Sequence, residues 1–170
     1  MQRAIAVFLT WTVCTMVGLR MSARMRTRKD LLAELWKAVH RVLLGIEHSN
    51  QPVWQLLNTC GGKMTSTAFC AIAQRIQSGE RTQQAWRTEM EQGEGVAWYA
   101  MLNEAERLRM DSFFATLGTS ERKCQKQNTE LILQELEKSC RDAEEIYLKK
   151  GRVYRTMGIL LGTGLGILFL

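Results

Sequence analysis

The stretch "TRKDLLAELWKAVHRVLLGIEHS" (27–49) decides the fold of this chain. Its apolar residues recur at intervals of three and four, which is the repeat of an amphipathic α-helix with one buried face. Thr27 and Asp30 fit a capping box, so we expect the helix to begin there. The apolar face comprises Leu31, Leu32, Leu35, Val39, Val42, Leu43 and Ile46. The pattern predicts a long helix packed against a core.

The rest of the middle of the chain also predicts helices, because it is rich in good helix formers and Pro52 is its sole proline. The expected helices are a short one at Pro52, one over about 66–77, one over 80–90 that ends before Gly93 and Gly95, and one over 96–117 that Gly118 closes. A last helix begins at Thr119 or Ser120 and runs toward Leu170, interrupted at most near Gly151. We predict an all-α bundle of about six helices.

Two apolar segments flank this middle. Residues 4–19 contain no charged side chain and would form a helix of about 24 Å, which Arg3 and Arg20 can lengthen by snorkelling. Residues 153–170 would form a helix of about 27 Å, close to the thickness of a bilayer core. We therefore expect a transmembrane helix at each end, and the last helix of the bundle runs into the second.

Basic residues gather beside both apolar segments, which predicts that these flanks lie on the cytoplasmic side. They are Arg20, Arg24, Arg26, Arg28, Lys29, Lys149, Lys150, Arg152 and Arg155. The expected organisation is an N-terminal anchor over 1–21, a cytoplasmic bundle over 22–152 and a C-terminal span over 153–170. Between the flanks acidic residues outnumber basic ones, which argues against a nucleic-acid partner despite the net charge of +6.

Three glycines in the second apolar segment, Gly158, Gly162 and Gly166, are spaced by four and share one helix face. Such a face lets another helix approach closely, either the first span of the same chain or another protein. The alternative is that glycine is simply tolerated in a membrane helix.

The residues that carry chemistry form no recognisable catalytic or metal-binding pattern. His40 and His48 are two turns apart, and the five cysteines lack metal-ligand spacing. No phosphate loop, nucleophile elbow or zinc signature occurs. We expect a membrane-bound interaction module without a cofactor, and not an enzyme.

Four segments in this order resemble the stage III sporulation protein AB family. They are "IEHSNQPVWQLL" (46–57), "IQSGERTQQAW" (76–86), "FFATLGTSERKCQKQNTELILQELE" (113–137) and "MGILLGTGLGILFL" (157–170). The most specific part is the Leu117–Gly118 step followed by Glu121 and Gln125. The family commonly has aspartate in place of Glu121 and a hydrophobic residue in place of Thr129.

The resemblance implies a subunit of the complex that joins mother cell and forespore in endospore-forming bacteria. The family's domain is similar to the cytoplasmic domains of type II secretion and type IV pilus platform proteins. It implies docking of the complex's ATPase, stage III sporulation protein AA, and contact with other membrane subunits in the mother-cell membrane around the forespore. Gly118, Glu121 and Gln125 carry the resemblance and are candidates for docking or for the fold.

Two other classes of protein fit parts of the sequence. One is a secreted or intermembrane-space helical structural protein with a cleaved signal peptide and a C-terminal anchor, although Arg20 and Arg24 crowd the expected cleavage site. The other is an enzyme that works at the membrane surface. Retention of residues 1–19 in the mature protein distinguishes the first of these from an anchored adaptor.

Overall fold

The computed structural model describes residues 2–48, 51–118 and 122–151, together with 153, 156, 157 and 160; the side chains of 2–11, 14 and 122 lie outside this description. Within these residues every regular element of secondary structure is a helix, which confirms the predicted all-α class. The chain divides into two compact units. Unit 1 comprises Met1–Lys29 and Arg141–Leu170, and unit 2 comprises Asp30–Cys140.

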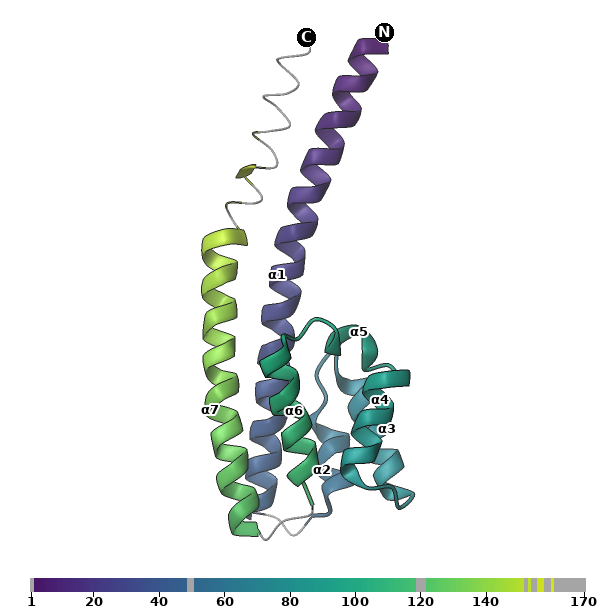
Figure 1. Cartoon of the computed structure of the whole chain (residues 1–170), viewed down its shortest axis with the longest axis vertical. Helices are drawn as coiled ribbons and strands as arrows, with labels where there is room; N and C mark the ends of the chain where they lie inside the picture. Colours follow the sequence, from purple (N-terminus) through teal and green to yellow (C-terminus); the bar gives the residue numbers. More distant parts are fainter. Residues whose placement is uncertain are drawn as a thin grey trace. The chain divides into compact units, whose positions relative to one another are not determined.

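In the part of the chain that the structure describes, seven α-helices and one π-helical turn follow one another (Figure 1). They are α1 (Gln2–His48), α2 (Val53–Cys60), α3 (Ser66–Gln77), α4 (Thr82–Gln92), α5 (Val96–Tyr99), α6 (Glu104–Thr116), α7 (Arg122–Ile146) and the π-turn η1 (Tyr147–Gly151). The helix α1 belongs to both units, because it continues from the first predicted anchor into the bundle.

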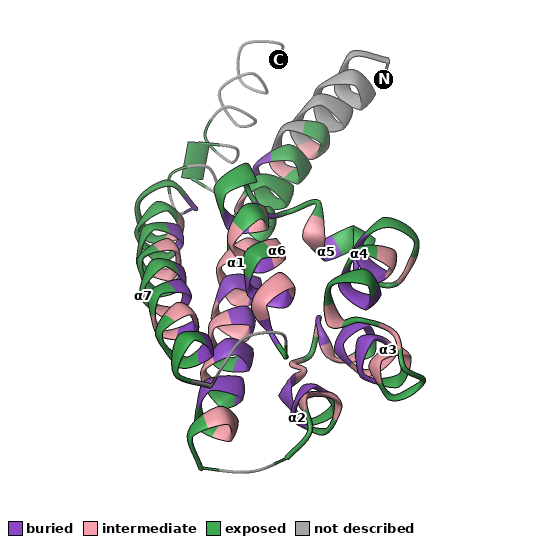
Figure 2. Cartoon of the chain, turned by 60° about the horizontal axis from the view of Figure 1, so that its bottom comes forward, coloured by how far each residue is buried: buried purple, intermediate pink, exposed green. Residues whose placement is uncertain are grey.

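Unit 2 is a bundle built on the apolar face of α1. Leu31, Leu32 and Leu35 are fully buried, and Val39 and Val42 are each 1% exposed. Figure 2 shows buried residues on the sides of α1, α6 and α7 that face one another. On the other side of the bundle, α2 packs against α3, α3 against α4, and α4 against α5 and α6. The predicted core face of α1 is therefore confirmed.

The helix start predicted at Thr27 is wrong. The helix runs through this position without a break, and the Thr27 hydroxyl donates a hydrogen bond to the carbonyl of Ala23 one turn earlier (3.0 Å). A threonine hydroxyl satisfied inside a helix does not cap a new one. Because no proline or other strong breaker lies between the apolar segment and the amphipathic segment, the two form one helix.

The single helix predicted over 96–117 is two helices, α5 and α6. Asn103 separates them as an N-cap: its Oδ1 accepts a hydrogen bond from the Glu106 backbone N–H (2.7 Å), and Glu106 Oε2 accepts one from the Asn103 N–H (2.8 Å). This reciprocal capping box stabilises a helix start where the periodic pattern suggested continuity. The last helix changes at η1, which agrees with the interruption predicted near Gly151.

Among the residues that the structure describes, no helix is long and apolar enough to cross a membrane. Most of the second predicted span lies outside the described residues, as do the side chains of 4–11 and 14 in the first.

An aromatic cluster fills the core between α3, α4, α5 and α6. The rings of Trp86 and Phe114 stack in parallel with centroids 4.0 Å apart, and Phe114 also contacts Phe69 (6.1 Å) and Phe113 (5.1 Å). Trp98 contacts Trp86 from α5. Stacked and edge-on aromatic pairs add to the hydrophobic energy of burial.

One carboxylate, that of Asp111, accepts the hydrogen bonds of the polar groups at the edge of this aromatic cluster. It accepts hydrogen bonds from Trp86 Nε1 (2.7 Å) and from the Tyr99 hydroxyl (3.0 Å). The Arg107 guanidinium lies 5.2 Å from the Tyr99 ring centroid and donates to the backbone carbonyl of Tyr99. Burial, followed by the hydrogen bond to Asp111, raises the pKa of Tyr99 to about 12. These contacts tie α4 and α5 to α6.

Truncation of Phe114 to alanine should destabilise unit 2 strongly. The side chain is fully buried, and its loss leaves a cavity beside Trp86 and Phe69, so we expect a loss of about 3–5 kcal/mol in the free energy of unfolding. Chemical denaturation followed by tryptophan fluorescence measures this. The control is Leu108→Ala, at a side chain that is 70% exposed, for which the change should stay within about 0.5 kcal/mol. Equal losses in the two variants would contradict the assignment of the core.

The raised pKa of Tyr99 predicts a specific loss of stability at high pH. Below pH 10 the phenol keeps its proton in both the folded and the unfolded states, so its contribution is fully present. Between pH 10 and about 12 the unfolded chain releases the proton while the folded chain retains it, so the free energy of unfolding falls. Thermal unfolding across this range should show the wild type losing its advantage over Tyr99→Phe. A pH-independent difference between the two proteins would refute it.

Candidate functional site

The turn after α6 carries the residues that the family resemblance singles out. Leu117 is buried and its N–H donates to the carbonyl of Phe113 (3.0 Å), and Gly118 then takes φ +82°. This left-handed conformation is accessible to glycine at little cost. A Cβ at Gly118 would lie 3.6 Å from Thr82 Oγ1 and 3.7 Å from Val53 Cγ2, which is ordinary contact. The backbone angle, and not the available space, therefore favours glycine.

Of the other two candidates in this region, Glu121 lies outside the described residues, and Gln125 is 7% exposed. The Gln125 carbonyl accepts a hydrogen bond from the Thr129 hydroxyl (2.7 Å), while its side-chain Nε2 has no hydrogen-bond partner in the part of the chain that the structure describes. Thr129, at a position where the family commonly has a hydrophobic residue, is itself buried and is satisfied by this bond. Both side chains therefore face the interior of unit 2.

Polar side chains on α7 form ion pairs and hydrogen bonds with α6 and α1. Arg109 of α6 pairs with Glu135 (2.7 Å) and donates to Ser139 (3.0 Å). Lys126 pairs with Glu47 of α1 (2.5 Å). The hydrogen bond from Lys126 lowers the pKa of Glu47 and raises the pKa of Lys126, the directions expected for an exposed ion pair. These contacts fix the register of α7 in unit 2.

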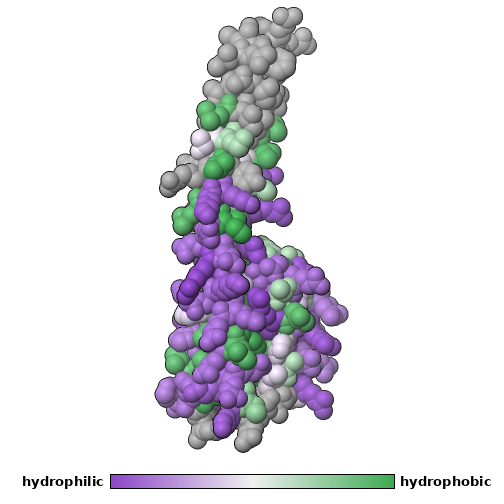
Figure 3. Space-filling view, turned by 60° about the vertical axis from the view of Figure 1, so that its left-hand side comes forward, coloured by the Kyte–Doolittle hydropathy of each residue, from purple (hydrophilic) through white to green (hydrophobic). Residues whose placement is uncertain are grey.

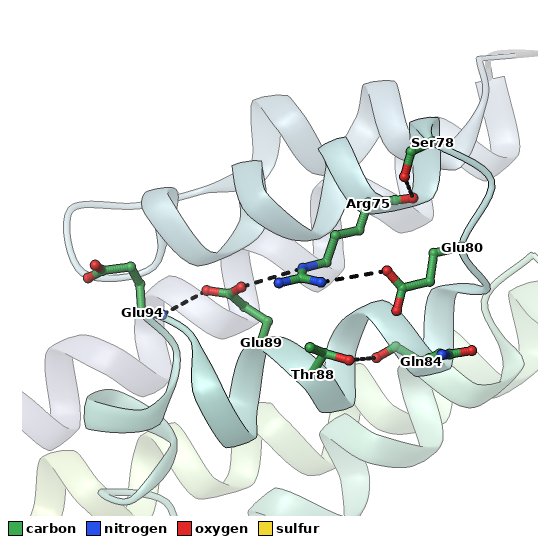
Figure 4. Close-up of polar contacts among 7 residues, drawn as sticks. All are labelled: Arg75, Ser78, Glu80, Gln84, Thr88, Glu89 and Glu94. Carbon is green, nitrogen blue, oxygen red and sulfur yellow. Dashed lines mark hydrogen bonds and ion pairs between the residues drawn. The ribbon is translucent and has the colours of Figure 1, made fainter.

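A buried carboxylate, Glu89, closes the loop that contains Gly93 and Gly95 (Figure 4). Its Oε1 accepts a hydrogen bond from the Glu94 N–H (2.8 Å), and Arg75 of α3 lies 4.0 Å from it and 3.8 Å from Glu80. A Cβ at Gly93 would clash with the Glu89 carboxylate, so any other residue there would displace this carboxylate from the Glu94 N–H. Because Glu89 is 3% exposed and bonded to the backbone, the arrangement is structural.

Glu34 of α1 plays a similar part at the loop between α2 and α3. Its carboxylate accepts hydrogen bonds from the Met64 N–H (3.0 Å) and the Thr65 hydroxyl (3.3 Å). Glu34 also lines a half-open hollow with Lys37, Arg41, Cys60, Gly61 and Gly62. Burial raises the pKa of the Cys60 thiol, which disfavours the reactive thiolate. The sequence analysis did not single out Glu34 and missed this role.

No cluster of three or more His, Cys, Asp or Glu side chains able to hold a metal ion occurs among the described residues. The buried carboxylates Glu89 and Glu106 and the half-buried Glu34 accept hydrogen bonds from backbone N–H groups, and Asp111 accepts them from Trp86 and Tyr99. The carboxylates of the described bundle therefore hold its helices and loops together by hydrogen bonds.

In unit 1, the predicted basic flanks form what we call the basic belt: Arg20, Arg24, Arg26, Arg28, Lys29, Lys149 and Lys150. Lys29 Nζ lies 5.4 Å from the centroid of the Tyr147 ring, and Lys149 forms an ion pair with Glu145. Arg20, Arg24 and Lys150 are exposed. Arg152 and Arg155 lie outside the described residues, as do Gly158, Gly162 and Gly166.

The fold defines a class of protein: an all-helical bundle whose first and last helices extend into a second, basic unit. The family model for stage III sporulation protein AB matches residues 3–170, so the chain belongs to this sporulation family. A solved structure described as "Stage III sporulation protein AB (SpoIIIAB)" shares the fold, with a TM-score of 0.60 and 21% sequence identity over 71% of this chain and 96% of the other. No curated protein matches the sequence.

Substitution of Gly118 tests the turn before α7. Gly118→Ala should lower the free energy of unfolding by about 1–2 kcal/mol, because alanine at positive φ brings its Cβ against the following carbonyl. Gly118→Asn should cost less, since asparagine tolerates the left-handed region. Urea denaturation of the three proteins gives the comparison. An alanine variant as stable as the wild type would show that the turn relaxes to negative φ.

Proposed function

We propose that this chain is a non-enzymatic, membrane-anchored adaptor in the complex that joins mother cell and forespore during endospore formation. In this proposal the helical bundle lies in the cytoplasm and docks the complex's ATPase, stage III sporulation protein AA. Family membership supports a part in sporulation. Location in the membrane around the forespore, the platform role and the ATPase partner extend it by analogy with the family.

The observation that carries the membrane anchor is the exposure of apolar side chains in unit 1. On α1, Val13, Met16 and Val17 are 56%, 57% and 62% exposed, and at the other end of the chain Leu160 is 64% exposed. A folded protein in water rarely displays adjacent large apolar side chains on one surface. Beside an uncharged segment at each end of the chain, they support insertion of both ends into a bilayer.

The docking proposal rests on the contrast between the two units. Unit 2 satisfies its buried carboxylates internally and presents a surface of mixed charge, while the cations of the basic belt lie in unit 1. The positive-inside rule places such a belt on the cytoplasmic side of the membrane, which would leave the bundle accessible to an ATPase.

Cysteine accessibility in non-sporulating cells that express the chain, whose membrane faces the medium directly, tests the topology. The background is a cysteine-free chain carrying one new cysteine, either at the exposed Gln83 of α4 or after Leu170. With a membrane-impermeant maleimide, only the C-terminal cysteine should label in intact cells, and both should label after permeabilisation. Labelling of Gln83→Cys in intact cells would place the bundle outside the cytoplasm and exclude ATPase docking.

Labelling of Gln83→Cys in intact cells would also favour the alternative of an intermembrane-space structural protein. If the topology holds, the full-length chain purified in mild detergent should bring the ATPase with it. Recovery of the other membrane subunits without the ATPase would separate the anchoring proposal from the docking proposal.

A further inference from the structure

Two contacts within unit 1 bring the cationic parts of its two helices to one level. A Cβ at the buried Gly151 would lie 3.6 Å from the Ser22 hydroxyl, so the end of η1 meets α1 at Ser22. The Lys29 ammonium, about two turns beyond Ser22 on α1, lies over the ring of Tyr147, one turn before Gly151. Arg20 and Arg24, two residues on either side of Ser22, therefore lie level with Lys149 and Lys150.

One face of α1 changes from apolar to cationic at this level. Val13, Val17, Arg20 and Arg24 follow one another at intervals of four, three and four, which places them on the same side of the helix. Val13 and Val17 are more than half exposed, and both arginines are exposed. Figure 3 shows hydrophobic side chains gathered next to hydrophilic ones in this part of the chain.

The second helix shows the same change in the opposite chain direction. Lys150 is followed by Val153, Met157 and Leu160, which are 51%, 50% and 64% exposed. Glu145 neutralises Lys149, but Arg20, Arg24 and Lys150 form no ion pair with any residue that the structure describes. Within the described part of the chain these three cations thus have no ion-pair partner, and they border an exposed apolar surface.

We propose that Arg20, Arg24 and Lys150 form a binding site for the headgroups of anionic phospholipids, with the neighbouring apolar side chains against the acyl chains. A phospholipid offers a phosphate next to a hydrocarbon layer, whereas a nucleic acid offers no hydrocarbon layer. The site rests on the membrane anchor proposed above and adds a preference for lipid charge.

The test uses the full-length chain reconstituted in phosphatidylcholine vesicles with trace spin-labelled phosphatidylglycerol or spin-labelled phosphatidylcholine. Electron paramagnetic resonance reports the fraction of each lipid that the protein immobilises. At low salt we expect a preference of several-fold for phosphatidylglycerol, since each cation near an anionic headgroup contributes about a fivefold effect. In 1 M salt the preference should fall toward parity, because the Debye length is then about 3 Å.

The variant Arg20→Gln/Arg24→Gln/Lys150→Gln should bring the ratio close to one. Its matched control, Lys63→Gln/Lys123→Gln/Lys138→Gln, removes three exposed cations from unit 2 and should keep the wild-type ratio. A wild-type ratio of one, a ratio that salt does not change, or equal effects of the two triple variants would overturn the lipid site. Flotation and alkaline extraction provide the separate readout: failure of the wild type to insert would overturn the membrane anchor itself.

Discussion

Burial of one face of α1 is the interaction on which the bundle depends. From Leu31 to Val42 this face is almost completely removed from water, and the helices of unit 2 supply the surfaces that cover it. At about 25 cal/mol per Å² of apolar surface, burial of a single leucine is worth about 2 kcal/mol, so a few such residues match the net stability of an ordinary domain. The other features of the bundle, its caps, ion pairs and loop contacts, decide how the covering helices are arranged.

Carboxylates that accept hydrogen bonds within the bundle fix several of its loops and helix starts. Glu34 holds the loop after α2, Glu89 holds the loop after α4, and Glu106 begins α6. Each accepts a hydrogen bond from a backbone N–H that would otherwise be left without a partner where the chain turns. Removal of one such acceptor leaves a buried donor unsatisfied, which is why a surface-like residue type can be a structural requirement here.

The sequence predicted the helices wherever the apolar periodicity was strong, and it misplaced helix boundaries where side-chain capping had to be judged. The core face of α1 follows from the spacing of its apolar residues alone. The helix continues past Thr27 because no residue there breaks it. The separation of α5 from α6 depends on the capping box at Asn103, which lies within a segment of helical periodicity. The structural roles of Glu34 and Asp111 could not be predicted, because their partners Met64 and Trp86 lie 30 and 25 residues away in the chain. At the candidate site, Gly118 carried a recognisable helix-end signal, whereas the burial of Gln125 emerged only from the packing of α7.

The π-turn η1 has a consequence for how the chain tolerates changes in length. A π-turn contains one residue more than an α-turn, and an added residue in a regular α-helix would rotate everything after it by about 100°. At Tyr147–Gly151 the wider turn absorbs that extra residue, so that Tyr147 and Gly151 both face α1. A relative that lacks one residue in this turn would form an unbroken α-helix with the same faces. Single-residue gaps should therefore be tolerated here and not in the body of α7.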